Sequence, residues 1–258
     1  MDYVEGPEMV ESGNPWVLTF GEPPVPPGIR LFCLPYAGGS PHSFHTWAEA
    51  LDPRIEVVAV ALPGQGHRIS EKPHEDWTAL TADAFAALEP LLEQPHAFYG
   101  HSFGARLGYE LARLAADRYP GATRRLFVGG CRSPQWPQDR PYMHEQPYDG
   151  FVASLRKLGG TPTVVLDHPA LMRSLFPSLQ AQIRLAELWE DVHGAPTTVP
   201  VTAMYGQEDP IDGEAAMRGW AAFGGPGSEV LAMAGGHFFL DADPASVLSV
   251  IDARLSGV

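Results

Sequence analysis

Short apolar runs alternate with amphipathic segments along most of the chain. The runs are rich in β-branched and aromatic residues, as buried strands are, and cover residues 29–35, 55–63, 96–100, 124–130, 199–206 and 228–235. Between them, apolar positions recur every three or four residues, which predicts helices over residues 42–51, 76–94, 104–119, 213–223 and 244–255. This alternation is typical of a mostly parallel sheet flanked by crossover helices. We therefore expect a single α/β domain over residues 1–258.

One interval, at about residues 133–195, departs from the alternation. It is far longer than an ordinary connection between a strand and a helix, and it opens within the proline-rich RSPQWPQDRP. Two amphipathic segments follow, over residues 148–158 and 168–192. We interpret the interval as an inserted helical lid. A helical subdomain without a gating role is the alternative, since amphipathic helices also bury one face for stability alone.

Composition and charge narrow the classes of function. No apolar run approaches the length that spans a bilayer, and the sequence starts with the acidic, polar MDYVEGPEMVESGNPW, so we expect a cytoplasmic protein. The net charge of -14 argues against a nucleic acid or an anionic membrane as partner, because both require a basic face. The remaining classes of partner are a small molecule and another protein. Cys33 and Cys131 lie in or beside strand-like runs, where reduced core thiols are expected.

The stretch YGHSFGARLGYELARLAADRY places a serine between an apolar strand and a helix. The strand ends at Gly100 and the helix follows at once, so the chain must turn sharply, which the small residues Gly100 and Gly104 allow. Such a turn exposes the Ser102 hydroxyl at the carboxyl edge of the sheet, beside the positive end of the helix. We predict that Ser102 is a nucleophile; a serine that only caps the helix is the alternative.

A serine nucleophile needs a base, and the base needs a group that orients it. Hydrolases that carry the serine on this kind of turn order the three as serine, acid, histidine. His237 follows the last strand and a Gly-Gly turn in AGGHFFLDADP, which makes it the candidate base. Asp209 ends the preceding strand in YGQEDP and is the candidate acid. The competing Glu208 is expected to face another way, and Asp212 to cap the next helix.

The other histidines considered are expected to be pocket or surface residues. His101 adjoins the serine but should point elsewhere from so tight a turn. The rest precede the serine in the chain: His42, His45, His67 and His74.

Two backbone N–H groups are expected to bind the oxyanion. Phe103 follows the serine directly and supplies one. Ala37 is expected to supply the other, because Gly38 and Gly39 follow it in PYAGGS and let the loop aim an amide inward. A phosphate-binding loop is the alternative for AGGS, although the lysine and spacing of a nucleotide loop are missing.

Seven motifs together resemble the type II thioesterases, the stand-alone editing hydrolases of polyketide and nonribosomal peptide synthesis. They are CLPYAGGS, ALPGQGHR, YGHSFGA, VGGCRSPQ, LGGTP, YGQEDP and AGGHFFL, and they extend over nearly the whole chain. The resemblance implies an α/β-hydrolase fold and hydrolysis of acyl thioesters on the phosphopantetheine arm of an acyl or peptidyl carrier protein. Because a serine, a histidine and water can perform both steps of such a hydrolysis, no metal or organic cofactor is expected. The resemblance assigns the catalytic roles to Ser102, Asp209 and His237, and the oxyanion amides to Ala37 and Phe103.

Two details refine the resemblance. In fused thioesterase domains the acid commonly follows an earlier strand, yet LFVGGCRSPQ offers no carboxylate before Asp139, which favours the stand-alone type. Gln182 in LQAQIRLAELW stands where family members often have an acidic residue in an RAD-like sequence, so atypical lid packing or substrate range is expected.

A small-molecule carboxylesterase of the same fold, or a catalytically silent binding protein on that scaffold, are the alternative functions. Carrier proteins of this class are usually acidic, as is this chain, so long-range attraction should not steer their encounter. Docking is then expected to use a small basic island near the site entrance, with Arg68, Arg132 and Arg140 as candidates. Solvated surface arginines are the alternative for each of them.

Overall fold

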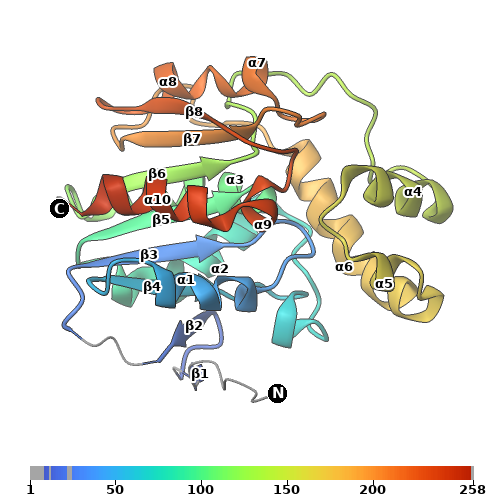
Figure 1. Ribbon diagram of the computed structural model, residues 1–258, viewed down its shortest axis with the longest axis horizontal. Helices are drawn as coiled ribbons and strands as arrows, with labels where there is room; N and C mark the ends of the chain where they lie inside the picture. Colours follow the sequence, from blue (N-terminus) through green and yellow to red (C-terminus); the bar gives the residue numbers. More distant parts are fainter. Residues whose placement is uncertain (1–8, 12, 22–24, 257–258) are drawn as a thin grey trace.

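The computed structural model describes residues 9–11, 13–21 and 25–256. Its centre is one sheet with strand order β1-β2-β4-β3-β5-β6-β7-β8 (Figure 1). The strands are β1 (Met9–Glu11), β2 (Val17–Phe20), β3 (Ile29–Leu34), β4 (Ile55–Val60), β5 (His96–His101), β6 (Thr123–Gly129), β7 (Val201–Gly206) and β8 (Glu229–Met233). From β4 to β8 all pairings are parallel, while β2 pairs antiparallel with β4 and β1 antiparallel with β2.

The expected mostly parallel α/β architecture is confirmed, and each of the six expected strands is present. Sequence analysis missed the antiparallel pair β1 and β2. Residues 1–8 and 257–258 of the expected single domain lie outside the described residues, as does much of the polar stretch at the start.

Helices cover both faces of the sheet, and Figure 1 shows α1 and α10 in front of it with α2 and α3 behind. One face packs against α2 (Trp77–Leu88), α3 (Phe103–Arg118), α7 (Glu214–Met217) and α8 (Trp220–Phe223). The other packs against α1 (His45–Ala50), α9 (Phe239–Ala242) and α10 (Pro244–Leu255). Short 3₁₀ helices are η1 (Pro41–Phe44), η2 (Gly66–Arg68) and η3 (Glu89–Leu91). The helix expected over residues 213–223 is two short helices, α7 and α8.

Alternate residues of the central strands enter the two cores, as the pleat requires. In β3, Phe32 and Leu34 join the core under α3, whereas Leu31 and Cys33 join the core under α10. Cys33 and Cys131 are both buried and free, which confirms the expected reduced core thiols. Within the described part of the chain, none of the helices is long and apolar enough to cross a membrane.

Three helices lie between β6 and β7, beside the carboxyl ends of the parallel strands (Figure 1). They are α4 (Tyr148–Leu158), α5 (Thr163–Leu166) and α6 (Pro169–Leu188). Their apolar faces enclose a small core of their own, made of Phe151, Leu155, Leu166, Met172 and Leu179. The carboxyl end of α6 joins the main core through Leu185. The insertion is therefore packed internally, and the carboxyl end of α6 joins it to the core of the domain.

Candidate active site

Ser102 occupies a strained turn between β5 and α3. Its φ of 52° makes it the one non-glycine residue with positive φ among the described residues. Such a conformation costs about 1–3 kcal/mol and is kept at functional sites. A Cβ at Gly100 would overlap the backbone of Gly104, and one at Gly104 would overlap the backbone of Leu34, so both glycines are required by the close approach of helix and strand. The Ser102 side chain makes no capping hydrogen bond to α3, which argues against the helix-capping alternative.

His237 and Asp209 form a buried pair beside the serine. The His237 Nδ1 atom lies 2.8 Å from Asp209 Oδ2, with 3% and 0% of the two side chains exposed. Burial raises the pKa of Asp209, but hydrogen bonds from His237 and from the N–H groups of Ile211 and Asp212 outweigh it, so the net pKa is below the ordinary value. The aspartate is therefore held as an anion that accepts a hydrogen bond from Nδ1–H of His237 and leaves Nε2 free to act as a base.

His101 forms a hydrogen bond with the backbone of His237. Its Nε2 atom lies 2.7 Å from the His237 carbonyl oxygen, which can only accept, so His101 donates there. Burial and the neighbouring His237 lower the pKa of His101 to about 3, which keeps the ring neutral. As expected, His101 does not point into the cavity with Ser102, but it is fully buried, so the prediction of a pocket or surface residue was wrong for it. Its contact with His237 was not expected, because 136 residues separate the two and no local pattern announces the pairing.

Asp212 does not have the role expected from its position. The residue that caps α7 is Gly213, whereas Asp212 is 2% exposed and pairs with Arg140, 3.3 Å away, and Arg106, 4.0 Å away. The prediction that Asp212 caps the next helix was therefore wrong. The attraction of two neighbouring arginines holds its carboxylate in a buried ion pair instead. Glu208 is exposed to solvent, and it is Asp209 that meets His237.

The loop over residues 36–39 faces the serine turn and is attached to α6. Gln182 Oε1 accepts hydrogen bonds from the Gly38 N–H at 2.7 Å and from Gln65 Nε2 at 2.9 Å. Gln65 Nε2 also donates to the Tyr36 carbonyl. Ala37 lies between these two attachment points and lines the same cavity as Ser102. Phe103 is the first residue of α3, a position whose N–H has no partner within the helix.

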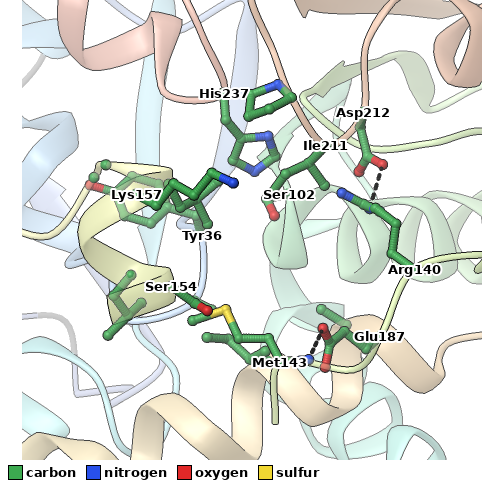
Figure 2. Close-up of a pocket in the computed structure, with 18 of the residues that line it drawn as sticks. Tyr36, Ser102, Arg140, Met143, Ser154, Lys157, Glu187, Ile211, Asp212 and His237 are labelled. Atoms are coloured by element: carbon green, nitrogen blue, oxygen red, sulfur yellow. Dashed lines mark hydrogen bonds and ion pairs between the residues drawn. The ribbon is translucent and has the colours of Figure 1, made fainter. Parts of the chain in front are cut away.

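A cavity of about 360 Å³ opens at this point, between the sheet edge and the inserted helices. Ser102, His237 and Ala37 contribute its floor, and residues of α4 and α6 its opposite wall. Figure 2 shows the Ser102 and His237 side chains on the cavity wall, with Lys157 extending from α4 toward them. The volume suits a small organic group.

Two of the three arginines that were expected at the surface are buried. The prediction that Arg68, Arg132 and Arg140 form a basic docking island at the surface was therefore wrong. Arg68 is 7% exposed, pairs with Glu71 at 2.6 Å and lies over the Trp16 ring. Arg132 is 4% exposed, and together with the partly exposed Arg140 it lines the cavity instead of the outer surface. The sequence gives the position of an arginine along the chain, but it does not show whether the fold buries that arginine beside a carboxylate or an aromatic ring.

The strand order and the strained serine turn define an α/β-hydrolase fold. A family model described as a thioesterase domain matches residues 29–255. Thioesterase PikA5 of Streptomyces venezuelae is 34% identical over 236 residues, 91% of this chain and 83% of that protein. The gramicidin S biosynthesis protein GrsT of Aneurinibacillus migulanus is 33% identical over 212 residues, 82% of this chain and 83% of that protein.

Solved structures give the same result. The type II thioesterase BorB from the borrelidin biosynthetic cluster has a TM-score of 0.83 at 33% identity, with 93% of this chain and 97% of that chain covered. RedJ of the prodiginine pathway of Streptomyces coelicolor has a TM-score of 0.81 at 32% identity, with 91% and 90% covered. The chain therefore belongs to the thioesterase domain family, and the resemblance to type II thioesterases is confirmed.

Proposed function

We propose that this thioesterase hydrolyses acyl groups from the phosphopantetheine arm of an acyl or peptidyl carrier protein. It thereby removes aberrant or stalled groups from a polyketide or nonribosomal peptide synthase. The names of its relatives support the pathway class, since PikA5 is a thioesterase, GrsT serves gramicidin S biosynthesis and BorB comes from a biosynthetic cluster. A cytoplasmic location belongs to the same proposal, because the substrate is bound to a synthase.

In the proposed mechanism, His237 Nε2 takes the proton of the Ser102 hydroxyl as its oxygen attacks the thioester carbonyl carbon. Asp209 holds the imidazole in the required tautomer and stabilises its positive charge. The N–H groups of Ala37 and Phe103 bind the oxyanion as it forms. The tetrahedral intermediate collapses, the sulfur leaves as a thiol with the proton from His237, and an acyl-serine remains.

Water completes the cycle. His237 removes a proton from a water molecule, the resulting hydroxide attacks the acyl-serine, and a second tetrahedral intermediate forms at the same amides. Its collapse returns the proton to Ser102 and releases a carboxylic acid. Each proton transfer uses groups of this chain and water.

The insertion over about residues 133–195 is proposed to act as a lid. Its helices supply the wall of the cavity opposite the serine, through residues such as Leu155, Leu158 and Ile183. The acyl group would lie against this wall, and movement of the helices would control access by the long arm. Their own small core is consistent with movement as a unit.

The observation that carries the proposal is the strained Ser102 beside the His237–Asp209 pair at the floor of the cavity. The experiment compares three substrates of the purified enzyme. They are a carrier protein loaded with an acyl group, the same acyl group on pantetheine, and the corresponding oxygen ester. Hydrolysis of the carrier-bound thioester with the highest kcat/KM supports the proposal. A preference for the oxygen ester would identify a small-molecule carboxylesterase, and a folded protein that a fluorophosphonate fails to label at Ser102 would be a silent binding protein.

A further inference from the structure

Gln65 is a buried polar residue next to the 36–39 loop, in the ALPGQGHR motif between β4 and η2. It is 1% exposed and is not among the described residues that line the cavity. Its Nε2 atom donates to the Tyr36 carbonyl oxygen at 3.0 Å and to Gln182 Oε1 at 2.9 Å. Its Oε1 atom is buried and has no hydrogen-bond partner among the described residues. The amide therefore acts in this fold as a donor, and one of its two acceptors is in the 36–39 loop.

The 36–39 loop is a type II β-turn. The Gly39 N–H donates to the Tyr36 carbonyl oxygen at 2.9 Å, and Gly38 has a φ of +75°. A type I′ turn would require a positive φ at Ala37 as well, and among the described residues the only non-glycine residue with positive φ is the serine of the β5–α3 turn. The Tyr36 oxygen thus accepts one hydrogen bond from within the turn and one from outside it.

The Tyr36 oxygen belongs to the peptide unit that also carries the Ala37 N–H. A trans peptide unit is planar, so its C=O and its N–H point in opposite directions. Because Gln65 and the turn hold the oxygen, the Ala37 N–H is directed away from Gln65. Ala37 lines the cavity together with Ser102, and its N–H has no hydrogen-bond partner among the described residues. An unpaired amide at this position is available to an oxygen of the substrate.

The backbone around Gln65 leaves its side chain little freedom. Gly64 has a φ of +82° and Gly66 a φ of +51°, a region of backbone conformation that favours glycine. A Cβ at Gly66 would lie 2.8 Å from Pro41, shortly after the turn, and a Cβ at Gly64 would lie 3.0 Å from Ser178 of α6. The motif therefore packs closely against both the chain that follows the turn and the long helix of the insertion. This packing holds the Gln65 amide where its donors reach the loop.

We propose that Gln65 is a positioning residue for the oxyanion amide of Ala37. It acts through the Tyr36 carbonyl group and does not touch the substrate. The proposal rests on the proposed function, because it deepens the role given there to the Ala37 N–H. Without the Gln65 donor the peptide unit is free to tilt, and its N–H then meets the developing oxyanion at a poorer angle, where hydrogen bonds weaken steeply.

The test begins with Gln65→Met, which keeps the length of the side chain and removes its donors. Complete removal of one oxyanion donor typically lowers kcat about 100- to 1,000-fold, and a misdirected donor should lose part of that. We therefore expect hydrolysis of butyryl-pantetheine by Gln65→Met to show a kcat about tenfold lower than that of the wild type, with KM changed by less than about twofold.

Propylboronic acid separates positioning from a merely structural role. The Ser102 oxygen adds to its boron atom, and one hydroxyl of the tetrahedral adduct takes the place of the oxyanion. We expect the inhibition constant to rise about tenfold in Gln65→Met, by the same factor as kcat falls. A variant that had only lost part of its folded fraction would show a lower kcat with the wild-type inhibition constant. That result, or an unchanged kcat, would overturn the proposal.

Gln180→Met is the matched control. The Nε2 atom of Gln180 also donates to a backbone carbonyl oxygen, that of His144 at 2.8 Å, but outside the 36–39 loop. Its loss should leave kcat and the inhibition constant within about twofold of the wild-type values. Losses of equal size in Gln65→Met and Gln180→Met would overturn the proposal, since any buried amide would then have the same effect.

Failure of the proposed function has a different signature. If the wild type hydrolyses no thioester, the proposed function is contradicted, but calorimetry with propylboronic acid still tests the positioning role. The wild type should bind it about tenfold more tightly than Gln65→Met. Equal dissociation constants, or binding to neither protein, would overturn the role of Gln65. If the wild type hydrolyses thioesters and Gln65→Met does so equally well, the proposed function stands and the role of Gln65 does not.

Discussion

Gln182 of α6 accepts a hydrogen bond from the backbone N–H of Gly38, with 2.7 Å between oxygen and nitrogen. Leu179, one turn earlier on the same helix, packs so closely on Gly38 that a Cβ there would overlap its side chain. Gly38 has a φ of +75° and directly follows Ala37, whose N–H we assign to the oxyanion. The position of α6 therefore sets the direction of that N–H, and the sequence departure at Gln182 keeps the acceptor oxygen in place.

Removing this acceptor should lower kcat more than it raises KM. In Gln182→Leu the Gly38 N–H loses its buried partner, the 36–39 loop relaxes, and we expect kcat to fall about tenfold or more. Gln182→Glu keeps an acceptor and should restore most of the loss. Gln180→Leu is the control, because Gln180 lies on the same helix but donates to the His144 carbonyl. Losses of equal size in the Gln180 and Gln182 leucine variants would mean that only helix stability had changed.

Asp209→Asn should leave the protein folded and lower kcat by about a thousandfold or more, because the amide cannot stabilise the imidazolium as the carboxylate does. The neighbouring Glu208→Gln, at an exposed position, should retain wild-type kinetics. Steady-state hydrolysis of one acyl-pantetheine measures both. Comparable losses in the two variants would remove Asp209 from the proposed triad.

His101 should make the protein less stable in acid. Its pKa falls from 6.5 in the unfolded chain to about 3 in the fold, so between these values the unfolded state binds the extra proton. Its contribution is complete above pH 6.5 and is lost as the pH falls toward about 3. In His101→Gln, the slope of the unfolding free energy between about pH 6 and 4.5 should decrease by about 1.4 kcal/mol per pH unit.

Urea unfolding of the wild-type and His101→Gln proteins at several pH values gives these slopes. Above about pH 7.5 the two curves should run parallel, because neither state then binds the proton. Parallel curves throughout the acid range would contradict a neutral, buried His101.

If the insertion acts as a lid, the residues that it contributes to the cavity wall should determine which acyl chain lengths are hydrolysed. Leu158→Trp adds volume at the cavity and should lower kcat/KM about tenfold for a long acyl chain while sparing acetyl. Val164→Trp, at a position 76% exposed on α5, is the control and should change neither. A uniform loss over all chain lengths in Leu158→Trp would favour a structural subdomain over a selective lid.

Much of the fold was predictable because its signals are local. The buried strands read as apolar runs, and α4 begins and ends at the residues expected from its amphipathic pattern. Ser102, Asp209 and His237 could be chosen because each follows a strand, and parallel strands bring their carboxyl ends to one edge. The short β1 and β2 lack such a pattern and depend on strand pairing, β2 with β4 and β1 with β2.

The remaining features depend on contacts between distant residues. Gly38 and Gln182 are 144 positions apart, and His101 and His237 are 136 apart, so neither bond has a local signature. The ion pairs of Asp212 likewise arise only when the loop after β7 packs beside Arg140 of the loop after β6 and Arg106 of α3. Charged residues were therefore the ones most often placed wrongly from the sequence.

Hydrolysis of a carrier-bound thioester by wild-type and Ser102→Ala protein tests the central claim most directly. Butyryl-carrier protein is incubated with each, and intact-protein mass spectrometry follows the loss of the acyl group. The account predicts rapid release of holo-carrier by the wild type and a rate at least about a thousandfold lower for the variant, with an unchanged melting temperature. Release by the variant within about tenfold of the wild-type rate would contradict the assignment of Ser102 as the nucleophile.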